Sequence, residues 1–434
     1  MSSGHSALGL NRTEALLGLA MVLYLWLSAP LLAVMGIPYD VPMGSFPAKI
    51  HPGTYVLALA ALSAWEAERW RLAGLKTSLQ RDPLLHASLA CMVACFAWAV
   101  LRHGPSGLAF FIDTLMAPAI AGLLITAQSD AARSRLKQLV MWLIVINAVL
   151  ALGEYASRVH LVPGIKGSGE DDPDAFFRAT GLLGHPLTNA KVTVTALPFI
   201  GALPWALRWR VAAVVLLSLA LLAFGGRTSL VMGALVYGLA GLACLLVHIA
   251  RGRFSYLQLT GGAVGLLLGM ALVTAIVLGT GLGDRVFHNF TWDNSADVRF
   301  LAWQTLDHFG GTDIWMGQPI EGIDHLAERV GIDMRYEAIE NFWVYMLLLL
   351  GITGFLPFVL GLALLAVHLI QRSGLWQSLA VLVYIVVASG TNSLASKTIS
   401  LLVLTVLVLT SAPERAPRAA RQPAPMGLRL KELQ

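Results

Sequence analysis

Charged residues are scarce in this chain. Only 13% of its 434 residues are Asp, Glu, Lys or Arg, whereas soluble proteins carry about 25%. The deficit excludes an ordinary soluble enzyme, and a hydrophobic fraction of 57% accompanies it. The net charge is +5, but no basic groove with interleaved aromatic residues is visible, so nucleic acid is not an expected partner.

Cysteine and metal-ligand clusters are scarce as well. The three cysteines, Cys91, Cys95 and Cys244, lie inside apolar runs, which does not indicate a disulfide framework. Cys91 and Cys95 would share one helix face, but no histidine or carboxylate joins them, so we interpret them as small core residues. His308 and His325 lack the spacing of metal ligands. We therefore expect no metal site.

Long apolar runs dominate the chain instead. They are near 20 residues long, the length of helix that crosses about 30 Å of hydrocarbon. Transmembrane β-barrels show alternating segments of about 10 residues, so the prediction is an all-α polytopic membrane protein with about twelve spans. No cleavable signal peptide is expected, because no small-residue cleavage site follows the first run. The predicted spans are 13–34, 54–69, 83–101, 107–127, 136–157, 187–206, 211–224, 229–249, 257–282, 342–370, 375–389 and 399–410.

The connections between spans differ in charge. Every even-numbered connection is basic, which predicts that both termini are cytoplasmic and that the odd connections face outward. The basic residues that carry this prediction include Arg71, Lys76, Arg133, Arg135, Arg208, Arg210, Arg251, Arg253 and Arg372.

One outer connection is far longer than the rest. We divide the chain into spans 1–9 (1–282), a large outer loop (283–341), spans 10–12 (342–411) and a disordered cytoplasmic tail (412–434). Residues 298–308 predict an amphipathic helix in the loop, whose apolar residues are mostly three or four apart: Phe300, Leu301, Trp303, Leu306 and Phe309. The run from Phe342 is overlong and contains Gly351, which predicts a half-helix before the span proper.

Two arginines stand close to predicted span ends on the outer side. Arg178 lies before the sixth span, near His185 and Asn189, and we interpret this stretch as an anion-binding turn. The alternative is a surface loop with a snorkelling arginine. Arg227, after Gly225 and Gly226, joins two spans through almost no loop. An arginine at that depth is costly, so we favour a functional role over a structural salt bridge.

The outer loop adds a third arginine and a carboxylate. Arg299 would project from the amphipathic helix, and three converging guanidinium groups are suited to a diphosphate, which they grip by bidentate hydrogen bonds. Glu340 stands at the edge of an apolar run and is a candidate general base. Asn341 would orient Glu340 or the substrate. The alternative for both is an interfacial belt with the neighbouring aromatic residues.

Five polar residues in or near the spans are functional candidates by default, because such groups are rare inside membranes. Lys397 would add a fourth cation near the outer end of the last span, with Asn392 in support. The five are Asp113, Asn147, Glu154, Asn392 and Lys397.

These motifs resemble the O-antigen ligase and polymerase superfamily, and within it the bacterial exopolysaccharide polymerases of the xanthan type. The resemblance covers most of the chain and the order of its motifs. The matching residues are Arg178, Gly184, His185, Pro186 and Asn189; Gly226, Arg227, Thr228 and Ser229; Arg299 and Trp303; and Glu340, Asn341, Gly351, Ile352, Thr353 and Gly354.

The resemblance implies a metal-independent and cofactor-independent glycosyltransferase of the bacterial inner membrane. It would transfer repeat units from undecaprenyl diphosphate to an acceptor glycan at the periplasmic face. Arg178, Arg227 and Arg299 would bind the diphosphate, and Lys397, from its position in the chain, would join them in binding it. Implied partners are the lipid-linked oligosaccharide, the acceptor glycan, membrane lipid and a chain-length or export protein.

Within this resemblance, Glu340 separates the alternatives. Ligases of the family have His-Asn where this chain has Glu340 and Asn341, which favours a polymerase with Glu340 as base. A ligase that attaches glycan to lipid or protein is the first alternative. A transporter or flippase is the second, although no internal repeat is visible.

Overall fold

The computed structural model describes residues 11–40, 44–67, 72–162, 177–252, 294–332, 339–392 and 394–412, with short pieces between 260 and 282. The secondary structure in these ranges is helical, and they contain no strand. Five of the described helices are long and apolar enough to cross a membrane, and three shorter apolar helices accompany them. The chain is therefore an all-α, membrane-embedded protein. Twelve spans stay a prediction, and most of the ninth predicted span, like the predicted tail beyond 412, lies outside the described residues.

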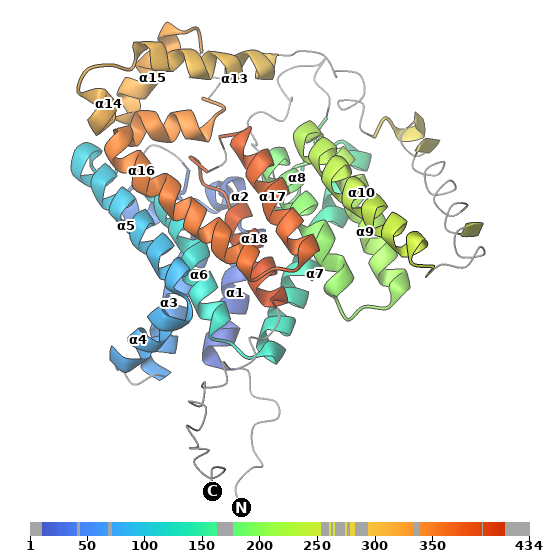
Figure 1. The fold of residues 1–434 in the computed structure, drawn as a ribbon. Coiled ribbons are helices and arrows are strands. Elements are labelled where there is room, and N and C mark those ends of the chain that lie inside the picture. The colour runs from blue at the N-terminus through green and yellow to red at the C-terminus, as the bar shows by residue number, and fades with distance from the viewer. Residues whose placement is uncertain are drawn as a thin grey trace, which may run out of the picture.

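The helices form a bundle that is capped at one end (Figure 1). The five long apolar helices are α5, α7, α9, α10 and α16. In chain order the bundle helices are α1 (Arg12–Trp26), α2 (Ala29–Val34), η1 (Phe46–Lys49), α3 (Pro52–Ala67), α4 (Leu72–Arg81), α5 (Pro83–His103), the π-helix η2 (Phe111–Met116), α6 (Ala117–Thr126), α7 (Asp130–Ser157), α8 (Pro186–Ala196), η3 (Leu197–Ala202), α9 (Leu207–Phe224), α10 (Arg227–Ala250), α16 (Phe342–Gln371), α17 (Leu375–Ser389) and α18 (Ser400–Ser411).

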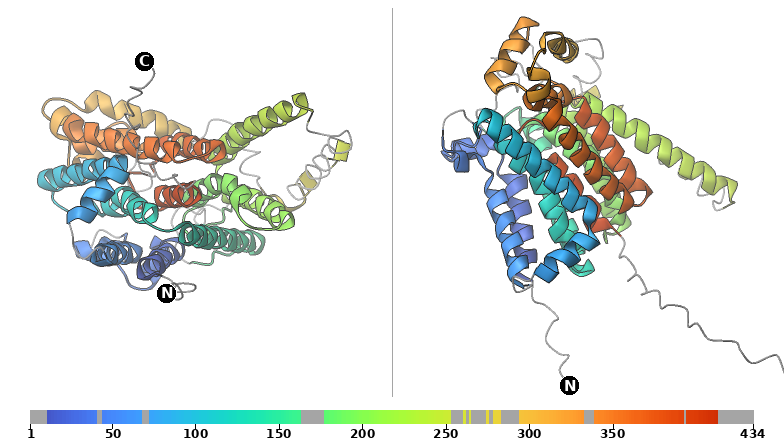
Figure 2. Two further views of the ribbon diagram at one scale, coloured as in Figure 1. Left: turned by 60° about the horizontal axis from the view of Figure 1, so that its bottom comes forward. Right: turned by 60° about the vertical axis from the view of Figure 1, so that its left-hand side comes forward.

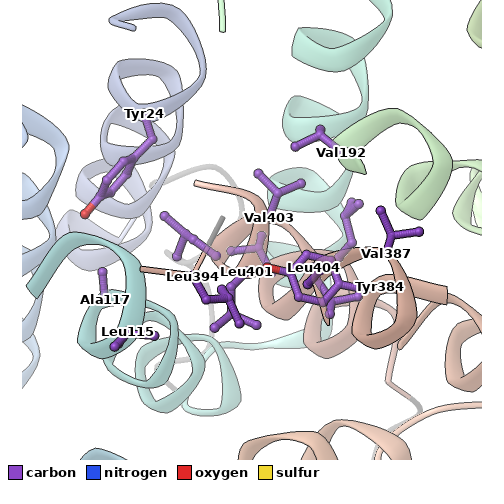
Figure 3. Close-up of a cluster of buried hydrophobic side chains, with 14 of the residues drawn as sticks. Tyr24, Leu115, Ala117, Val192, Tyr384, Val387, Leu394, Leu401, Val403 and Leu404 are labelled. Carbon is purple, nitrogen blue, oxygen red and sulfur yellow. The ribbon is translucent and has the colours of Figure 1, made fainter. Parts of the chain in front are cut away.

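Helix α18 lies in the middle of the bundle (Figure 2). Every side chain from Ser400 to Thr410 is buried. A helix that is apolar on all sides is stable only when other helices surround it. Its Leu401 and Leu404 gather with Tyr384 of α17 and with Leu394 in one apolar cluster (Figure 3). The last predicted span is therefore the core around which the others pack.

Helix α16 is bent at Gly351, as the sequence predicts. Gly351 has φ 58° and ψ 178°, a conformation open essentially to glycine alone. The half-helix Phe342–Leu350 precedes the bend. The indole Nε1 of Trp98 donates to the carbonyl of Leu350 (2.9 Å), and His103 Nε2 lies 3.0 Å from the carbonyl of Leu349. These α5 side chains stabilise carbonyls that the bend removes from the helix.

The cap consists of residues 294–332, which form α13 (Asn294–Gln304), η4 (Thr305–His308), α14 (Asp313–Met316) and α15 (Ile320–Arg329). The predicted helix at 298–308 is confirmed, and its predicted apolar face is confirmed in part, because Phe309 is buried and Leu301 and Leu306 pack against the core. Phe300 and Trp303 are 61% and 54% exposed, whereas Val298, Ala302 and Thr305 are buried. Small residues allow the helix to rest closely on the protein, and the aromatic residues face outward.

Two predicted spans are shorter helices than expected. The run 13–34 divides into α1 and α2 because Pro30 starts a new helix, and the carbonyl of Leu27 is bound by His51 Nε2 at 2.8 Å. The run 187–206 is α-helical only to Ala196, after which Pro198 lies in the 3-10 helix η3. Proline removes a backbone donor in both places.

Candidate functional site

The turn at residues 177–185, which contains Arg178, is hydrogen-bonded to Glu154 at the end of α7. The buried Glu154 carboxylate accepts hydrogen bonds from the backbone N–H groups of Leu161, Thr180 and Gly181, each at 2.7 Å. Gly181 has φ 48°, and a Cβ there would lie 2.6 Å from Asn147 Oδ1. A carboxylate with three N–H donors is well satisfied when buried. Glu154 therefore fixes the turn.

Two asparagines connect this turn to helices α7 and α8. Asn147 Nδ2 donates to Asn189 Oδ1 (2.6 Å), and Asn147 Oδ1 accepts from the N–H of Leu182 (2.8 Å). Asn189 Nδ2 donates to the carbonyls of Thr180 (2.5 Å) and His185 (3.0 Å). Asn189, a predicted supporting residue, thus positions the turn. The sequence named Asn147 and Glu154 without this role.

The turn that carries Arg178 contacts the end of α9, just before the turn that leads to Arg227. Arg178 Nε donates to the carbonyl of Phe224 at 3.2 Å, at the C-terminus of α9, where positive charge is favoured. Arg227 begins α10 three residues later. A Cβ on Gly226 would overlap that of Ala190 in α8. The structure therefore brings the Arg178 turn, the α9–α10 turn and α8 together at one end of the bundle.

Glu340 pairs with Arg299 between the cap and α16. Arg299 Nη2 lies 2.9 Å from Glu340 Oε2, and the two side chains are 36% and 33% exposed. Exposed ion pairs of this kind contribute only about 0–1 kcal/mol to stability, so a substrate group can displace one partner from the other. Asn341 Oδ1 accepts from the N–H groups of Trp343 (3.0 Å) and Val344 (3.3 Å). Asn341 is therefore the N-cap of α16.

Lys191 of α8 links the part of the site around Arg178 with the part around Glu340. It is not among the residues predicted from the sequence. Its side chain is 1% exposed, and Nζ lies 3.4 Å from Thr391 Oγ1. The carbonyl of Thr391 accepts from the N–H of Phe342 at 3.2 Å, two residues after Glu340. A lysine inside an apolar run is itself a signal of function, and that signal was available in the sequence.

Lys397 lies in a different cluster. Its ammonium donates to the backbone carbonyl of Tyr39, stands 4.0 Å from the centre of the Tyr39 ring and lies 4.0 Å from Asp40 Oδ1. Burial raises the pKa of Asp40, and the positive charge of Lys397 acts against that rise. Asp113 accepts from Tyr39 (3.0 Å) and Thr54 (2.5 Å) beside it. No contact in the described part of the chain joins Lys397 to the three arginines.

The remaining predicted residues have simpler surroundings. His185 caps α8, accepting from the N–H of Leu187 at 3.2 Å. Asn392 Oδ1 is buried and has no hydrogen-bond partner among the described residues. Within those same ranges no group of three or more His, Cys, Asp or Glu side chains is arranged to hold a metal ion.

The arrangement combines cations with an accessible carboxylate at one end of a membrane bundle. Guanidinium and ammonium groups near a helix start can bind a phosphate, and Glu340 can accept a proton. Comparison with family models, curated proteins and solved structures finds no match to this chain.

Proposed function

We propose that this protein is a polysaccharide polymerase that transfers lipid-linked repeat units from undecaprenyl diphosphate to an acceptor glycan. The observation that supports it is the series of contacts from Arg178 through the α9–α10 turn and α8 to Glu340 and Arg299. Binding of a diphosphate and removal of a proton are the two tasks of such a transfer. In this proposal the site faces the periplasm and both termini are cytoplasmic.

In the proposed reaction Glu340 accepts the proton of an acceptor sugar hydroxyl. The hydroxyl oxygen then forms a bond to the anomeric carbon of the donor sugar. The bond from that carbon to the diphosphate oxygen breaks, and its electron pair leaves with undecaprenyl diphosphate. Arg178 and Arg227 stabilise the charge that develops there, while Arg299 orients Glu340 until substrate replaces their ion pair.

Purified protein supplied with lipid-linked repeat units tests this proposal. We expect longer lipid-linked chains. Attachment of the glycan to another lipid or to protein would mean a ligase, and movement of the lipid across a vesicle membrane without elongation would mean a flippase.

Variants separate the proposed roles. Arg227→Ala and Arg299→Ala should fold normally and lower chain elongation on the order of 10²-fold or more, because Arg227 stabilises the developing charge and Arg299 orients Glu340. Glu340→Gln should be inactive. Arg102→Ala, which removes an exposed arginine at the end of α5, is the matched control and should elongate normally. Full elongation by the Glu340→Gln protein would eliminate Glu340 as the base.

A further inference from the structure

Asp113 is a buried carboxylate that has no part in the proposed reaction. It is 2% exposed and lies in the π-helix η2, a rare kind of turn that is often found at functional sites. Its oxygens accept hydrogen bonds from Tyr39 Oη (3.0 Å), Thr54 Oγ1 (2.5 Å) and the backbone N–H of His51 (3.1 Å). A carboxylate is costly inside a membrane protein, and one that is retained there is a functional candidate. The hydrogen bond to the N–H of His51 fixes the backbone of that residue.

His51 connects Asp113 to the break between α1 and α2 (residues 27–30). The N–H of Gly53 donates to His51 Nδ1 at 3.0 Å, so the proton of the neutral ring is on Nε2, which donates to the carbonyl of Leu27 at 2.8 Å. Burial lowers the pKa of His51 to about 4, so the ring is a neutral donor at physiological pH. Leu27 is the C-cap of α1, where a helix leaves carbonyls without intrahelical donors. His51 therefore holds the end of α1 in place.

The α1–α2 break packs against the turn that contains Arg178. Gly184 lies in this turn with φ 71°, and a Cβ built on it would lie 2.9 Å from Ser28 Cβ and 2.8 Å from Pro30 Cδ. Both separations are below 3.0 Å, a limit that real Cβ atoms essentially never cross. The Arg178 turn is thus held twice. Its backbone is hydrogen-bonded to side chains of α7 and α8, and Gly184 packs closely against the break.

Lys397 contributes to the same network from the segment before α18. Its ammonium donates to the backbone carbonyl of Tyr39 and lies 4.0 Å from the centre of the Tyr39 ring. That ring meets the His51 imidazole edge-on, with ring centres 5.4 Å apart, and the Tyr39 hydroxyl donates to Asp113. Through Tyr39, Lys397 therefore supports both Asp113 and His51 without touching a substrate.

We propose that Asp113 and His51 are positioning residues, which set the place of the Arg178 turn through the α1–α2 break. Asp113 fixes His51, His51 fixes the end of α1, and the break packs against Gly184. The binding of a diphosphate by Arg178 rests on the proposed polymerase function, whereas this path of contacts does not. Misplacement of a binding group by 1 Å can lower turnover about 10²-fold. Loss of the path should therefore lower kcat/KM for the lipid-linked donor and leave KM for the acceptor glycan unchanged.

Two substitutions of His51 separate positioning from a merely structural role. Both lose the stack of the imidazole on Tyr24, whose ring centre is 4.6 Å away, and each loses one hydrogen bond, so both should lower the melting temperature similarly. In His51→Asn the short amide reaches the place of Nδ1 and accepts from Gly53, but the carbonyl of Leu27 loses its donor. In His51→Gln the longer amide reaches the place of Nε2 and keeps that donor. We expect His51→Asn to lower donor kcat/KM on the order of tenfold or more, and His51→Gln to retain most of it.

A double variant tests whether Asp113 acts through His51. Asp113→Asn replaces one accepting oxygen by an NH₂ group that cannot accept, so it should lower donor kcat/KM as His51→Asn does. If both residues act through the same contacts, the combined variant should lose no more than the more damaging single variant. Losses that multiply would mean that the two residues act independently and would contradict the path.

Gly184→Ala tests the contact at the other end of the path. The new methyl group would push the turn away from the α1–α2 break while Asp113 and His51 are unchanged, so we expect the same loss of donor kcat/KM. Gly104→Ala is the matched control, because Gly104 has φ 76° and nothing within 4 Å of an added Cβ. It carries a similar backbone strain without a contact. Equal elongation by the two glycine variants would mean that the break does not set the place of the turn.

Hydrogen exchange measured by mass spectrometry reports on the turn without any turnover. The N–H groups of Thr180, Gly181 and Leu182 are bonded to side chains of α7, and they should exchange faster in His51→Asn than in His51→Gln. Equal exchange in the two variants overturns the inference. Wild-type protein that elongates glycan while both His51 variants elongate equally well contradicts this inference alone. Faster exchange in His51→Asn, in a protein that never elongates glycan, supports the path and contradicts the polymerase.

Discussion

Replacing Gly226 by alanine tests whether α8 sets the position of Arg227. Gly226 precedes Arg227 in the α9–α10 turn, and its backbone has φ −81°, which an alanine adopts without strain. The only obstacle is steric. The new Cβ would lie less than 3.0 Å from the Cβ of Ala190, a separation that real Cβ atoms essentially never show. Because both atoms are attached directly to backbone, no flexible side chain can move away.

The size of the effect follows from that separation. Ordinary contact begins at 3.4 Å, so the turn and α8 must separate by more than the 0.4 Å between these limits. Overpacking of this kind costs about 1–3 kcal/mol in unfolding free energy. Misplacement of a binding group by 1 Å can lower turnover about 10²-fold. We therefore expect Gly226→Ala to fold, to melt at a lower temperature and to lose most chain elongation by purified protein.

Two further variants make the result interpretable. Gly238→Ala, on the same helix α10, has open space around the new Cβ; it should elongate like the wild type and melt no lower, because alanine is the better helix former. Adding Ala190→Gly to Gly226→Ala removes the opposing methyl group and should restore elongation. The added glycine lowers the free energy of unfolding by about 1 kcal/mol, because it lies inside a helix. If Gly226→Ala melts and elongates like Gly238→Ala, then α8 does not determine where Arg227 lies.

Two other substitutions test how the site is supported. Gly351→Ala would bring a Cβ to 2.5 Å from the backbone of Trp315 in the cap, so limited proteolysis should cut the cap faster than in the control Gly311→Ala. The free energy of unfolding should also be about 1–3 kcal/mol lower than that of the control, whose glycine has φ 65° and open surroundings. Equal behaviour of the two variants would contradict docking of the cap at the bend. Glu154→Gln should lower the melting temperature, because an amide NH₂ would face backbone N–H donors and an unsatisfied donor costs about 1–3 kcal/mol. Glu328→Gln on the exposed face of α15 is its control, and melting curves that coincide would mean that Glu154 does not hold the turn.

The features that could be predicted from the sequence are those that the bilayer itself imposes on the chain. Long apolar runs must form helices in lipid because no water satisfies the backbone, and this predicted the all-α bundle. The bend at Gly351 was also predictable, since the run from Phe342 is too long for one straight span and glycine adopts the backbone angles of a bend most readily. The contact between the turn that carries Arg178 and the end of α9, near Arg227, depends on helix packing and was expected only in outline.

Residue-level packing was not accessible from one sequence. Phe300 and Trp303 have the spacing of a buried helix face, yet they are exposed. The smaller residues Val298, Ala302 and Thr305 are buried instead, because close approach of the cap favours small side chains over aromatic area. Lys397 was grouped with the arginines by side of the membrane alone, whereas its partners Tyr39 and Asp40 belong to a connection more than 350 residues earlier. Such long-range pairing depends on how the helices pack.

Three consecutive residues of α8 explain how distant parts of the chain come to share one site. Successive residues in an α-helix point about 100° apart, so Asn189, Ala190 and Lys191 face three different neighbours. Asn189 binds the turn that carries Arg178, Ala190 contacts the turn that begins at Gly226, and Lys191 reaches Thr391 beside the start of α16. One short helix thus sets the mutual positions of two arginine-bearing turns and the segment that carries Glu340. It follows that substitutions in α8 should affect anion binding and elongation together, whereas substitutions in the cap should affect elongation alone.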